Sequence, residues 1–524
     1  MHWRTNRPEN PSPQPASAHH TAGLLVVVII AFAVSRLGYY FAGVRFGTKP
    51  LTAYWQFIDP ELLRNDLLRS VFHLHSQPPL FNLFLGATLK LFPNHWTAAF
   101  AGVYLAFGAV LALSLYLLMI RLGVSPWLSA GLTLVFMLSP TCVLYENWLF
   151  YTYPLAMLLC LAAVFLHRFL ASGRVRDGMV FFALLAVIGL TRSMFHVLWF
   201  VAMVFLLLLH SRQRWRRIAL VSSIPLLVVL LLYAKNLCLF GSFTSSSWIG
   251  MNFSRITTFQ LPREDRRQLF REGTVSSFVL VHPFTGDPRL YESYYANCPT
   301  TNIPVLDEVL KTTGRVNYHN LAFVDVSKQY LADALLVLTS YPRTYLSAVG
   351  EGCATYLRPA SDYRPLRENR AQIGRLDRVV NLVLYGHLLT RGSSPPAVKK
   401  GIAPPKREPG QPALWLVVGY PFLVVWGLVF ARSRIGAGAA NRAVAVTVVF
   451  ILITVLYVTV VGNAVELGEN NRFRFMVDPL MLVLLGLCLN QGLRRLRGVS
   501  LRWGAGGRLG RVSAHGADSD GAED

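Results

Sequence analysis

Long apolar runs alternate with short polar stretches along most of the chain, and this pattern dominates the sequence. A helix that crosses a bilayer needs about 20 predominantly apolar residues. The runs therefore predict an all-α polytopic membrane protein with about ten transmembrane helices, at 22–44, 96–120, 126–144, 148–166, 179–191, 195–210, 217–234, 413–431, 443–461 and 476–491.

One apolar run is too short to cross. The stretch "PLFNLFLGATLKLF" at 79–92 has about 14 residues, and as a helix it would cover about 20 Å of the roughly 30 Å hydrocarbon core. It follows a polar segment, 45–79, that carries several acids. We expect 45–95 to be an outer loop whose helices lie at the membrane interface.

The charges divide between the two ends of this threading. Arginine clusters fall in loops on one side, at Arg121, Arg168, Arg174, Arg176, Arg212, Arg214, Arg216, Arg217, Arg432, Arg434, Arg442, Arg494, Arg495 and Arg497. The acids Asp59, Glu61, Asp66, Glu146, Glu466 and Glu469 fall on the other side. Basic loops are typically cytoplasmic, so both termini are predicted to be cytoplasmic, in a multi-pass protein of the inner (cytoplasmic) membrane.

Composition agrees with this class. The chain has 524 residues, 53% of them hydrophobic and only 15% charged, with a mean hydropathy of +0.42. Its net charge of +23 is accounted for by the cytoplasmic loops, so no nucleic-acid partner is implied. The pattern predicts five segments: a disordered N-terminus 1–21, a membrane module 22–234, a large outer loop 235–412, C-terminal spans 413–491, and a disordered tail 492–524 that is basic and then acidic.

The large outer loop has its own helical patterns. Residues 321–349 have helical periodicity, 376–389 are amphipathic and suited to lie on the membrane, and 393–412 form a Pro-rich linker. Its two cysteines, Cys298 and Cys353, would be able to form a disulfide in an oxidising compartment. No Walker loop or G-x-G-x-x-G motif after a strand pattern is present in the sequence.

Polar side chains gather at the predicted outer ends of the spans, where they are costly to bury and often functional. The four clusters are Asp59, Glu61, Asp66, His73, His75 and Gln77; Tyr145, Glu146, Asn147 and Trp148 with Tyr151 and Tyr153; Arg192 and His196 with Lys235 and Asn236; and Glu466, Glu469, Asn470, Asn471, Arg472 and Arg474. Sequence-distant helices thus bring carboxylates and guanidinium groups to one level.

Each carboxylate also has a purely structural interpretation. Asp59 stands before Pro60 in "DPELL", a typical helix N-cap. Asp66 is spaced to pair with Arg69 three residues later. Glu146 is placed where it would be solvated at the end of a span. Capping does not prevent a catalytic role, so both interpretations stay open.

The outer arginines are more informative than the cytoplasmic ones. Arg192, Arg472 and Arg474 run against the positive-inside bias, although snorkelling at the interface is an alternative for the last two. Carboxylates with outer cations suit glycosyl transfer from a lipid phosphate. A carboxylate takes the proton of the acceptor hydroxyl, the sugar passes through an oxocarbenium-like state, and arginine or lysine stabilises the leaving phosphate.

Two motifs carry a family resemblance. The stretch "HSQPPL" after an acid-bearing loop, and the late "ENNRFRFMVDPL", resemble the GT-C fold membrane glycosyltransferases. Within that fold the chain is similar to the clan of protein O-mannosyltransferases, aminoarabinose transferases and RgtA/B/C/D-like enzymes. The order of one span, an outer loop, six spans and a large outer loop is similar as well.

The resemblance implies roles for the acids. The general base of the family falls best on Asp59, with Asp66 as its competitor and Glu61 behind it, because the adjacent acids of many relatives are replaced here by Asp59-Pro60-Glu61. The second outer acid falls on Glu146. Asp59 and Glu146 are also suited to share a Mg²⁺ or Mn²⁺ ion, since oxygen ligands bind both metals; no other cofactor or metal ligand is implied.

The resemblance also implies binding residues. The cations that contact the donor phosphate fall on Arg472 or Arg474, with Arg192 and Lys235 as further candidates. The family motif "HPP" is changed here to "HSQPP", which makes His75 and Gln77 candidate contacts to the sugar or acceptor.

The sequence therefore predicts an inverting glycosyltransferase that uses a polyprenyl-phosphate-linked sugar at the outer face of the membrane. The acceptor is a glycan, a lipid or a protein. One alternative is a lipid-linked polysaccharide polymerase or ligase, which relies on arginine and histidine in a late outer loop. Another is a lipid or solute transporter, for which repeated halves and charges near mid-span are expected; the sequence shows neither.

Overall fold

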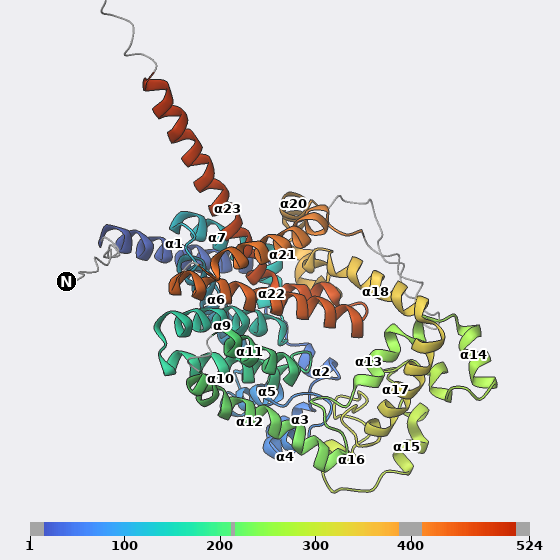
Figure 1. Ribbon diagram of the computed structural model, residues 1–524. Helices are drawn as coiled ribbons and strands as arrows, with labels where there is room; N and C mark the ends of the chain where they lie inside the picture. The colour runs from blue at the N-terminus through green and yellow to red at the C-terminus, as the bar shows by residue number, and fades with distance from the viewer. Residues whose placement is uncertain (1–14, 211–214, 387–410, 437, 510–524) are drawn as a thin grey trace, which may run out of the picture.

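The structure of the protein is a computed structural model that describes residues 15–210, 215–386, 411–436 and 438–509 (Figure 1). Throughout these residues the regular elements are helices, and the β contacts are two isolated bridges. The apolar runs form α1 (Pro15–Phe41), α6 (Trp96–Arg121), α7 (Pro126–Met137), α8 (Pro140–Glu146), α9 (Thr152–Ser172), α10 (Val175–Thr191), α11 (Val197–His210), α12 (Trp215–Phe240), α21 (Leu414–Arg434), α22 (Ala439–Val465) and α23 (Asn470–Leu509).

The two outer loops contain shorter helices. The first loop holds α2 (Pro50–Ala53), α3 (Pro60–Asn65), α4 (Leu67–Phe72) and α5 (Leu80–Leu91). The large loop holds α13 (Ile249–Ile256), α14 (Arg263–Arg271), α15 (Glu292–Ala296), α16 (Pro304–Asp307), α17 (Ala322–Ser340), α18 (Pro342–Tyr356), α19 (Arg367–Gln372) and α20 (Gly374–Tyr385), with 3₁₀ turns at Thr258–Gln260, Ser277–Leu280, Pro288–Tyr291, Ala360–Asp362 and Arg364–Leu366.

The chain is a polytopic membrane protein with fewer full-length spans than predicted. Seven of the described helices are long and apolar enough to cross a membrane: α1, α6, α9, α12, α21, α22 and α23. The pair α7 and α8 adds an eighth if it is one broken span, since the two are bent by 60°. The prediction of ten full spans is therefore corrected to seven or eight.

The lower number of full-length spans has local causes. Proline at position 140 opens α8 as a new helix, which breaks the run predicted as one straight span. The helices α10 and α11 have 17 and 14 residues, about 26 and 21 Å of helix, so they are shorter than the span criterion. Both still lie in the bundle, where α10 packs against α9 and α12, and α11 against α12 and α22.

The bundle has a buried centre and an exposed rim. In α23, 72% of the most apolar window is buried, against 17% in α1, so α23 lies at the centre and α1 at the rim. Large apolar side chains of α1 stay exposed, among them Val26, Ile30 and Val34. A water-facing helix would not carry such a surface, but a lipid-facing helix does.

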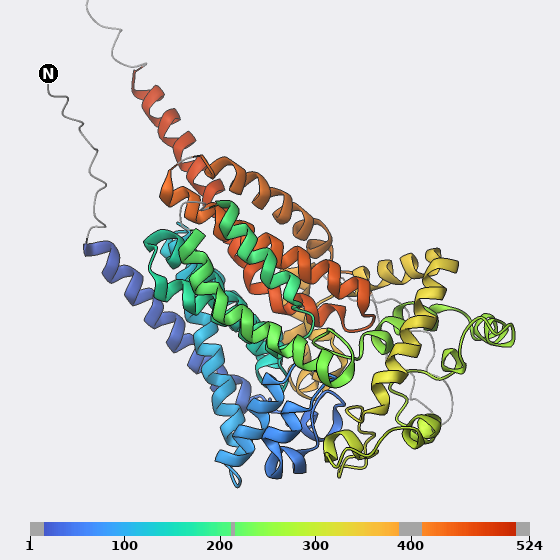
Figure 2. The ribbon, with the colours of Figure 1, turned by 60° about the horizontal axis from the view of Figure 1, so that its bottom comes forward.

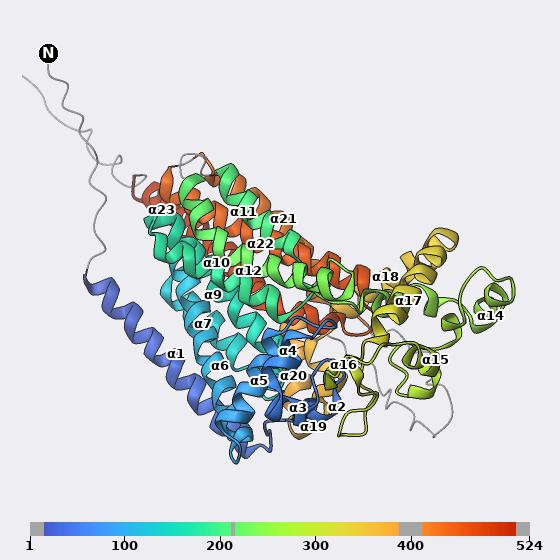
Figure 3. The ribbon, with the colours of Figure 1, turned by 90° about the horizontal axis from the view of Figure 1, so that it is seen from below.

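The basic loops gather at one end of the bundle. Arg494 in α23 donates to the carbonyl of Gly123 after α6 at 3.1 Å, and Arg168 pairs with Asp177 at 2.9 Å across the turn between α9 and α10. The start of α1 and the end of α23 project from this same end (Figures 2 and 3). The fold thus brings basic side chains of separate loops to one end of the bundle, and the assignment of this end to the cytoplasm stays a prediction.

The two outer loops fold together at the opposite end (Figure 1). The first loop lies beside a lobe made by α13 to α18, in which α13 packs against α17. The lobe has a core of its own, separate from that of the bundle, which includes Trp248, Met251, Phe323 and Tyr330. Burial of these aromatic and aliphatic side chains is what stabilises so long a loop.

Several local predictions are confirmed. The short apolar run is a 12-residue helix, α5, and 321–349 forms α17 and the first part of α18. The amphipathic segment is helical as α20.

The prediction of disorder at the two ends of the chain is corrected in part. Helix α1 begins at Pro15 and α23 continues to Leu509, so helix extends into both segments predicted to be disordered. Most of the Pro-rich linker, and residues 1–14 and 510–524, lie outside the described residues.

The structure tests the possible disulfide between Cys298 and Cys353. Cys298 lies after α15 and Cys353 in α18, and both are free thiols in the structure. The optional disulfide between them is therefore not formed.

Candidate functional site

Buried polar contacts join the "HSQPP" stretch to the large loop. His75 contacts the Ser247 hydroxyl through Nδ1 at 2.7 Å and the His319 carbonyl through Nε2 at 2.9 Å. His319 contacts the Ser76 hydroxyl through Nδ1 at 2.5 Å and the Phe57 carbonyl through Nε2 at 2.9 Å. We call these contacts, together with those of Asp59 below, the loop clasp.

The two histidines of the loop clasp are neutral. Burial lowers the pKa of His75 to about 4, and burial together with the nearby charge of Lys311 holds the pKa of His319 well below its usual range. A carbonyl is only an acceptor, so each Nε2 carries the proton and donates it, and each Nδ1 accepts from a serine hydroxyl. His75 is therefore a fixed structural contact between the loops.

Asp59 also belongs to the loop clasp. As N-cap of α3 it accepts from the Glu61 amide at 3.0 Å, and it accepts from the Thr312 amide at 2.5 Å and the Thr312 hydroxyl at 2.6 Å. Beside it, Lys311 donates to the carbonyls of Tyr54 and Phe57, at 3.1 and 2.6 Å. Burial lowers the pKa of Lys311 to about 7, although the charge of Asp59 opposes the shift.

Asp59 faces a cavity as well. The cavity has about 660 Å³ of space, part of it open to solvent, and is lined by Asp59, Glu61, Leu62, Pro304, Glu308, Leu310, Lys311, Thr312 and Asn317. Asp66 lies half-buried between α3 and α4, and its side chain caps neither helix. The suggested pair with Arg69 is not formed, because Arg69 donates to the Asn302 carbonyl instead.

Glu146 lies inside the bundle. At the end of α8 it forms a two-pronged ion pair with Arg36 of α1, at 2.9 and 2.7 Å, and accepts from the Tyr153 hydroxyl at 2.7 Å. A Cβ at Gly108 of α6 would come within 2.5 Å of its carboxylate. The alternative that Glu146 is simply solvated is wrong, because 4% of the residue is exposed.

Two of the predicted phosphate-binding cations have backbone partners. Arg474 donates to the carbonyls of Tyr356 and Arg358, at 2.8 and 3.0 Å, and pairs with Asp478. Lys235 donates to the carbonyls of Phe72 and Leu74, at 2.9 and 2.8 Å, where it closes the end of α4. In this state neither cation is free to meet a phosphate.

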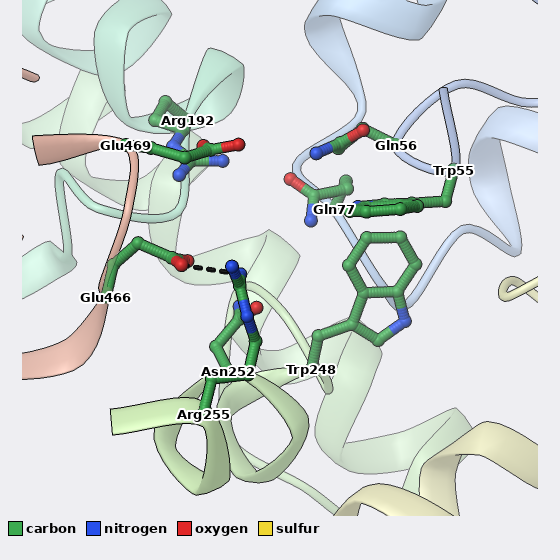
Figure 4. A pocket seen from close by; sticks show the side chains of 9 residues that line it. All are labelled: Trp55, Gln56, Gln77, Arg192, Trp248, Asn252, Arg255, Glu466 and Glu469. Carbon is green, nitrogen blue, oxygen red and sulfur yellow. Dashed lines mark hydrogen bonds and ion pairs between the residues drawn. The ribbon is translucent and has the colours of Figure 1, made fainter. Parts of the chain in front are cut away.

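A polar pocket lies where the bundle, the first loop and the lobe meet, and we call it the junction pocket (Figure 4). It has about 290 Å³ of space, part of it open to solvent. Its lining joins all three parts of the fold: Trp55, Gln56 and Gln77 from the first loop, Trp248, Asn252 and Arg255 from the lobe, and Arg192, Glu466 and Glu469 from the ends of bundle helices.

Unpaired amides and aromatic faces line one side of the junction pocket. The side chain of Gln77 is buried, with 5% of the residue exposed, and it makes no hydrogen bond within the described structure. In Figure 4 it points into the pocket next to Gln56 and the ring of Trp55. The Trp248 nitrogen donates away from the pocket, to the Tyr318 carbonyl at 3.0 Å. Amides beside indole rings are suited to bind a sugar through its hydroxyls and its C–H face.

The opposite side of the junction pocket carries two carboxylates. One oxygen of Glu466 accepts from Arg255 at 2.5 Å, and the other has no hydrogen bond to a described residue. Both oxygens of Glu469 are engaged, one by the Tyr363 hydroxyl at 3.0 Å and one by Arg472. The two acids therefore differ in what they leave open to a ligand.

Their pKa values diverge as well. Burial raises the pKa of Glu466, and the charge of Arg255 offsets only part of that effect. Burial acts on Glu469 in the same direction, but the charges of Arg472 and Arg255 outweigh it and lower the pKa of Glu469 to about 2. Neighbouring acids with separated pKa values are typical of sites that transfer protons.

Arg192 is the cation of the junction pocket without an acid partner. It donates to the Tyr151 hydroxyl, and its guanidinium lies 5.0 Å from the centre of the Tyr151 ring. Its Nε is buried and has no hydrogen-bond partner, and no ion pair with a described carboxylate is formed. A guanidinium with open donors beside a pocket is suited to bind an anion.

The structure thus brings together part of the predicted set. Gln77 and Arg192 line the junction pocket, and Arg472 lies behind Glu469; Asp59, His75, Lys235, Arg474, Asp66 and Glu146 lie elsewhere. Sequence reasoning did not single out Trp55, Gln56, Trp248, Asn252 or Arg255. The last three stand in "SSSWIGMNFSR", whose mixture of aromatic and polar residues was the available signal.

The metal prediction has no direct support among the described residues. Asp59 and Glu146 have separate partners, Thr312 and Arg36. Within the part of the chain that the structure describes, no group of three or more His, Cys, Asp or Glu side chains is placed to hold a metal ion.

Known proteins offer distant likenesses. No family model matches the chain, and no curated protein matches it. A structure of the archaeal oligosaccharyltransferase AglB from Archaeoglobus fulgidus, in complex with an inhibitory peptide and a dolichol-phosphate, is similar with 12% identity and a TM-score of 0.43, over 97% of this chain and 53% of that one. The apo form of the Archaeoglobus fulgidus oligosaccharyltransferase is similar with 11% identity and a TM-score of 0.36, over 92% and 52%. The chain spans about half the length of these structures.

Proposed function

We propose that the protein is a membrane glycosyltransferase that transfers a sugar from a polyprenyl-phosphate donor to an acceptor hydroxyl in the junction pocket. The observation that carries this proposal is the lining of that pocket. Indole faces and unpaired amides stand on one side, and an open guanidinium with two carboxylates stands on the other. This combination matches the needs of a sugar bound through a phosphate.

The sugar would lie against the first loop. Trp55, which is half-buried at the pocket, offers an apolar ring to the C–H side of the sugar, and Gln77 offers an amide that both donates and accepts. Trp248 is 1% exposed and stacks on His319, so it supports the pocket wall. The amide of Gln77 has no hydrogen-bond partner among the described residues and lines the pocket, so its donor and acceptor positions are open to a ligand. Gln77 is therefore the side chain we expect to distinguish a polyhydroxylated ligand from an apolar one.

The phosphate would lie against Arg192. This side chain follows α10, a helix of the membrane bundle, and the pocket is at that end of the bundle. A phosphate there would be near the membrane while its lipid chain stays in the bilayer. The charge that develops on the leaving phosphate is then stabilised by a donor already in place.

The transporter alternative receives less support. Its signature would be charged groups near mid-span along a pathway. The charged side chains inside the described bundle are instead paired, as Arg36 with Glu146 and Arg474 with Asp478. A polymerase or ligase would use the same donor, so the acceptor is what separates it from the proposed transferase.

The test is a deletion strain of the host organism. We expect its membranes to accumulate one polyprenyl-phosphate-linked sugar, seen by mass spectrometry, and one envelope glycan, lipid or protein to lose the same sugar. Expression of the wild-type chain should reverse both changes, and expression of Arg192→Ala should not. An unchanged set of polyprenyl-linked sugars in the deletion strain would contradict the proposal.

A further inference from the structure

We propose that Glu466 is the general base of this transfer, in place of the first-loop acid that the sequence favours. The inference rests on the proposed function and concerns which carboxylate takes the proton. Its basis is the position of Glu466 in the lining of the junction pocket, with one carboxylate oxygen open toward the space.

The geometry of Glu466 suits a base. It stands directly after α22, with 8% of the residue exposed. Arg255 holds one oxygen at 2.5 Å and also donates to the Leu467 carbonyl at 3.2 Å, so the carboxylate has a fixed orientation. Figure 4 shows this ion pair at the edge of the pocket, opposite Gln77. An acceptor hydroxyl in the pocket would meet the second oxygen.

Glu469 and Asp59 lack such an open oxygen, whereas Asp66 and Glu61 keep oxygens open among the described residues but do not line the junction pocket. Both oxygens of Glu469 have partners, Tyr363 and Arg472. Asp59 accepts three hydrogen bonds from Glu61 and Thr312, and it faces a different cavity. To act as a base, either acid would have to give up a hydrogen bond, or accept a further one at a crowded oxygen.

The charges around Glu466 come from every side of the pocket. Arg255 faces it from α13, Glu469 from its own loop, Arg192 from the end of α10, and Arg472 from α23. Burial and Glu469 raise its pKa, whereas the three arginines lower it, and the net direction is upward. A base with a raised pKa binds the proton more strongly, so this environment favours proton transfer.

The step balances as follows. The acceptor oxygen forms a bond to C1 of the sugar while its proton passes to the open oxygen of Glu466. The bond between C1 and the phosphate oxygen breaks, and its electron pair stays on the polyprenyl phosphate, facing Arg192. The products are the glycosylated acceptor and the lipid phosphate, and the proton leaves Glu466 to water. A single displacement of this kind inverts C1.

Membranes of the deletion strain supply both substrates for the test. Purified full-length protein in detergent is added to them, and loss of the accumulated donor lipid is followed by mass spectrometry between pH 4 and 9. We compare the wild type, Glu466→Gln, Asp59→Asn and the matched control Glu368→Gln. Glu368 is an exposed acid that pairs with Lys49 at the same end of the molecule.

We expect Glu466→Gln to lower the rate by about 10²- to 10⁴-fold. It should also remove the acid limb of the pH profile, which is the fall in rate at low pH as the base becomes protonated. Asp59→Asn should keep that limb, and the control should match the wild type. Arg255→Gln removes a charge that lowers the pKa of Glu466, so the limb should move to higher pH. A merely structural ion pair would not move it.

Three results would overturn the inference: a rate for Glu466→Gln within about threefold of wild type, loss of the acid limb in Asp59→Asn alone, or an unmoved limb in Arg255→Gln. If Glu466→Gln does not fold, the position of the acid limb in Arg255→Gln decides, and an unmoved limb overturns the inference. If the wild-type protein itself consumes no donor lipid, the proposed function fails, which separates the two failures.

Discussion

The junction pocket and the loop clasp use similar residues for opposite purposes. Both are polar, both are largely buried, and both join the first loop to the lobe. In the loop clasp each oxygen of Asp59 and each ring nitrogen of His75 has a partner within the protein. In the junction pocket, Gln77, Arg192 and one oxygen of Glu466 have open positions.

This difference separates stability from function. A buried polar group that is fully paired holds two segments together, and removing one partner costs stability. A polar group that lines a pocket without a protein partner adds little to stability and stays available to a ligand. Substitutions in the loop clasp should therefore change the stability of the protein, whereas substitutions in the junction pocket should change turnover.

The largest effect on turnover outside the base is expected from Arg192→Ala. Removal of the open guanidinium should lower donor consumption by about 10²- to 10³-fold, because the leaving phosphate loses its stabilising donor. The melting temperature should stay close to that of the wild type. Arg343, an exposed arginine of α18, gives the control Arg343→Ala, which should match the wild type. Equal rates in both variants would contradict a role for Arg192 in binding the phosphate.

Asp59→Asn tests whether the loop clasp stabilises the protein. The amide nitrogen cannot accept the hydrogen bonds of Thr312 and Glu61, so we expect a loss of about 1–3 kcal/mol of stability. Thermal unfolding in detergent measures it. Thr312→Val should destabilise as well, and the double variant should cost less than the sum because the two residues share an interaction. Strict additivity would contradict the contact.

The loop clasp also predicts a pH dependence of stability. The pKa of His75 is lowered to about 4 in the folded protein, against about 6.5 when unfolded. The unfolded state therefore binds the extra proton between these values, and stability falls as pH falls from 6.5 toward 4, by up to about 1.4 kcal/mol per pH unit. Melting temperatures at pH 7 and 5 should differ less in His75→Asn, and an equal difference would count against the buried neutral histidine.

The smallest expected effect is that of Gln77→Ala in the junction pocket. The side chain has no partner in the described protein, so stability should not fall. Donor consumption at low donor concentration should fall about tenfold, the value of one hydrogen bond to a substrate. Gln268→Ala, on the exposed face of α14, is the matched control. A melting temperature that falls while turnover stays constant would place Gln77 in the loop clasp.

The sequence predicted the fold better than the site. Apolar runs indicated nearly every bundle helix, because lipid requires long apolar helices with internal hydrogen bonds. The length argument also identified α5 as too short to cross. The sequence did not indicate that Pro140 would break a span, or that α10 and α11 would be short, because boundaries depend on packing against neighbouring helices.

For the candidate site, the sequence named two residues that line the junction pocket, Gln77 through an unusual motif and Arg192 through a charge on the unexpected side. It favoured Asp59 because spacing in the first loop is visible along the chain, whereas Thr312, more than 250 residues later, is not. It also assigned Glu146 to the outer face, since nothing local shows that Arg36 lies beside it. Partners that are distant in sequence decided both outcomes.

The sequence by itself determined that the chain is a helical membrane protein, with basic loops at one end and acid-bearing loops at the other. Periodicity, length and charge can be read locally along the chain, and a bilayer requires each spanning segment to be a long apolar helix. Only the tertiary structure decided which polar groups are paired and which are open. That depends on long-range contacts between the first loop, the lobe and the ends of α10 and α22, and burial in those contacts distinguishes Glu466 from Asp59.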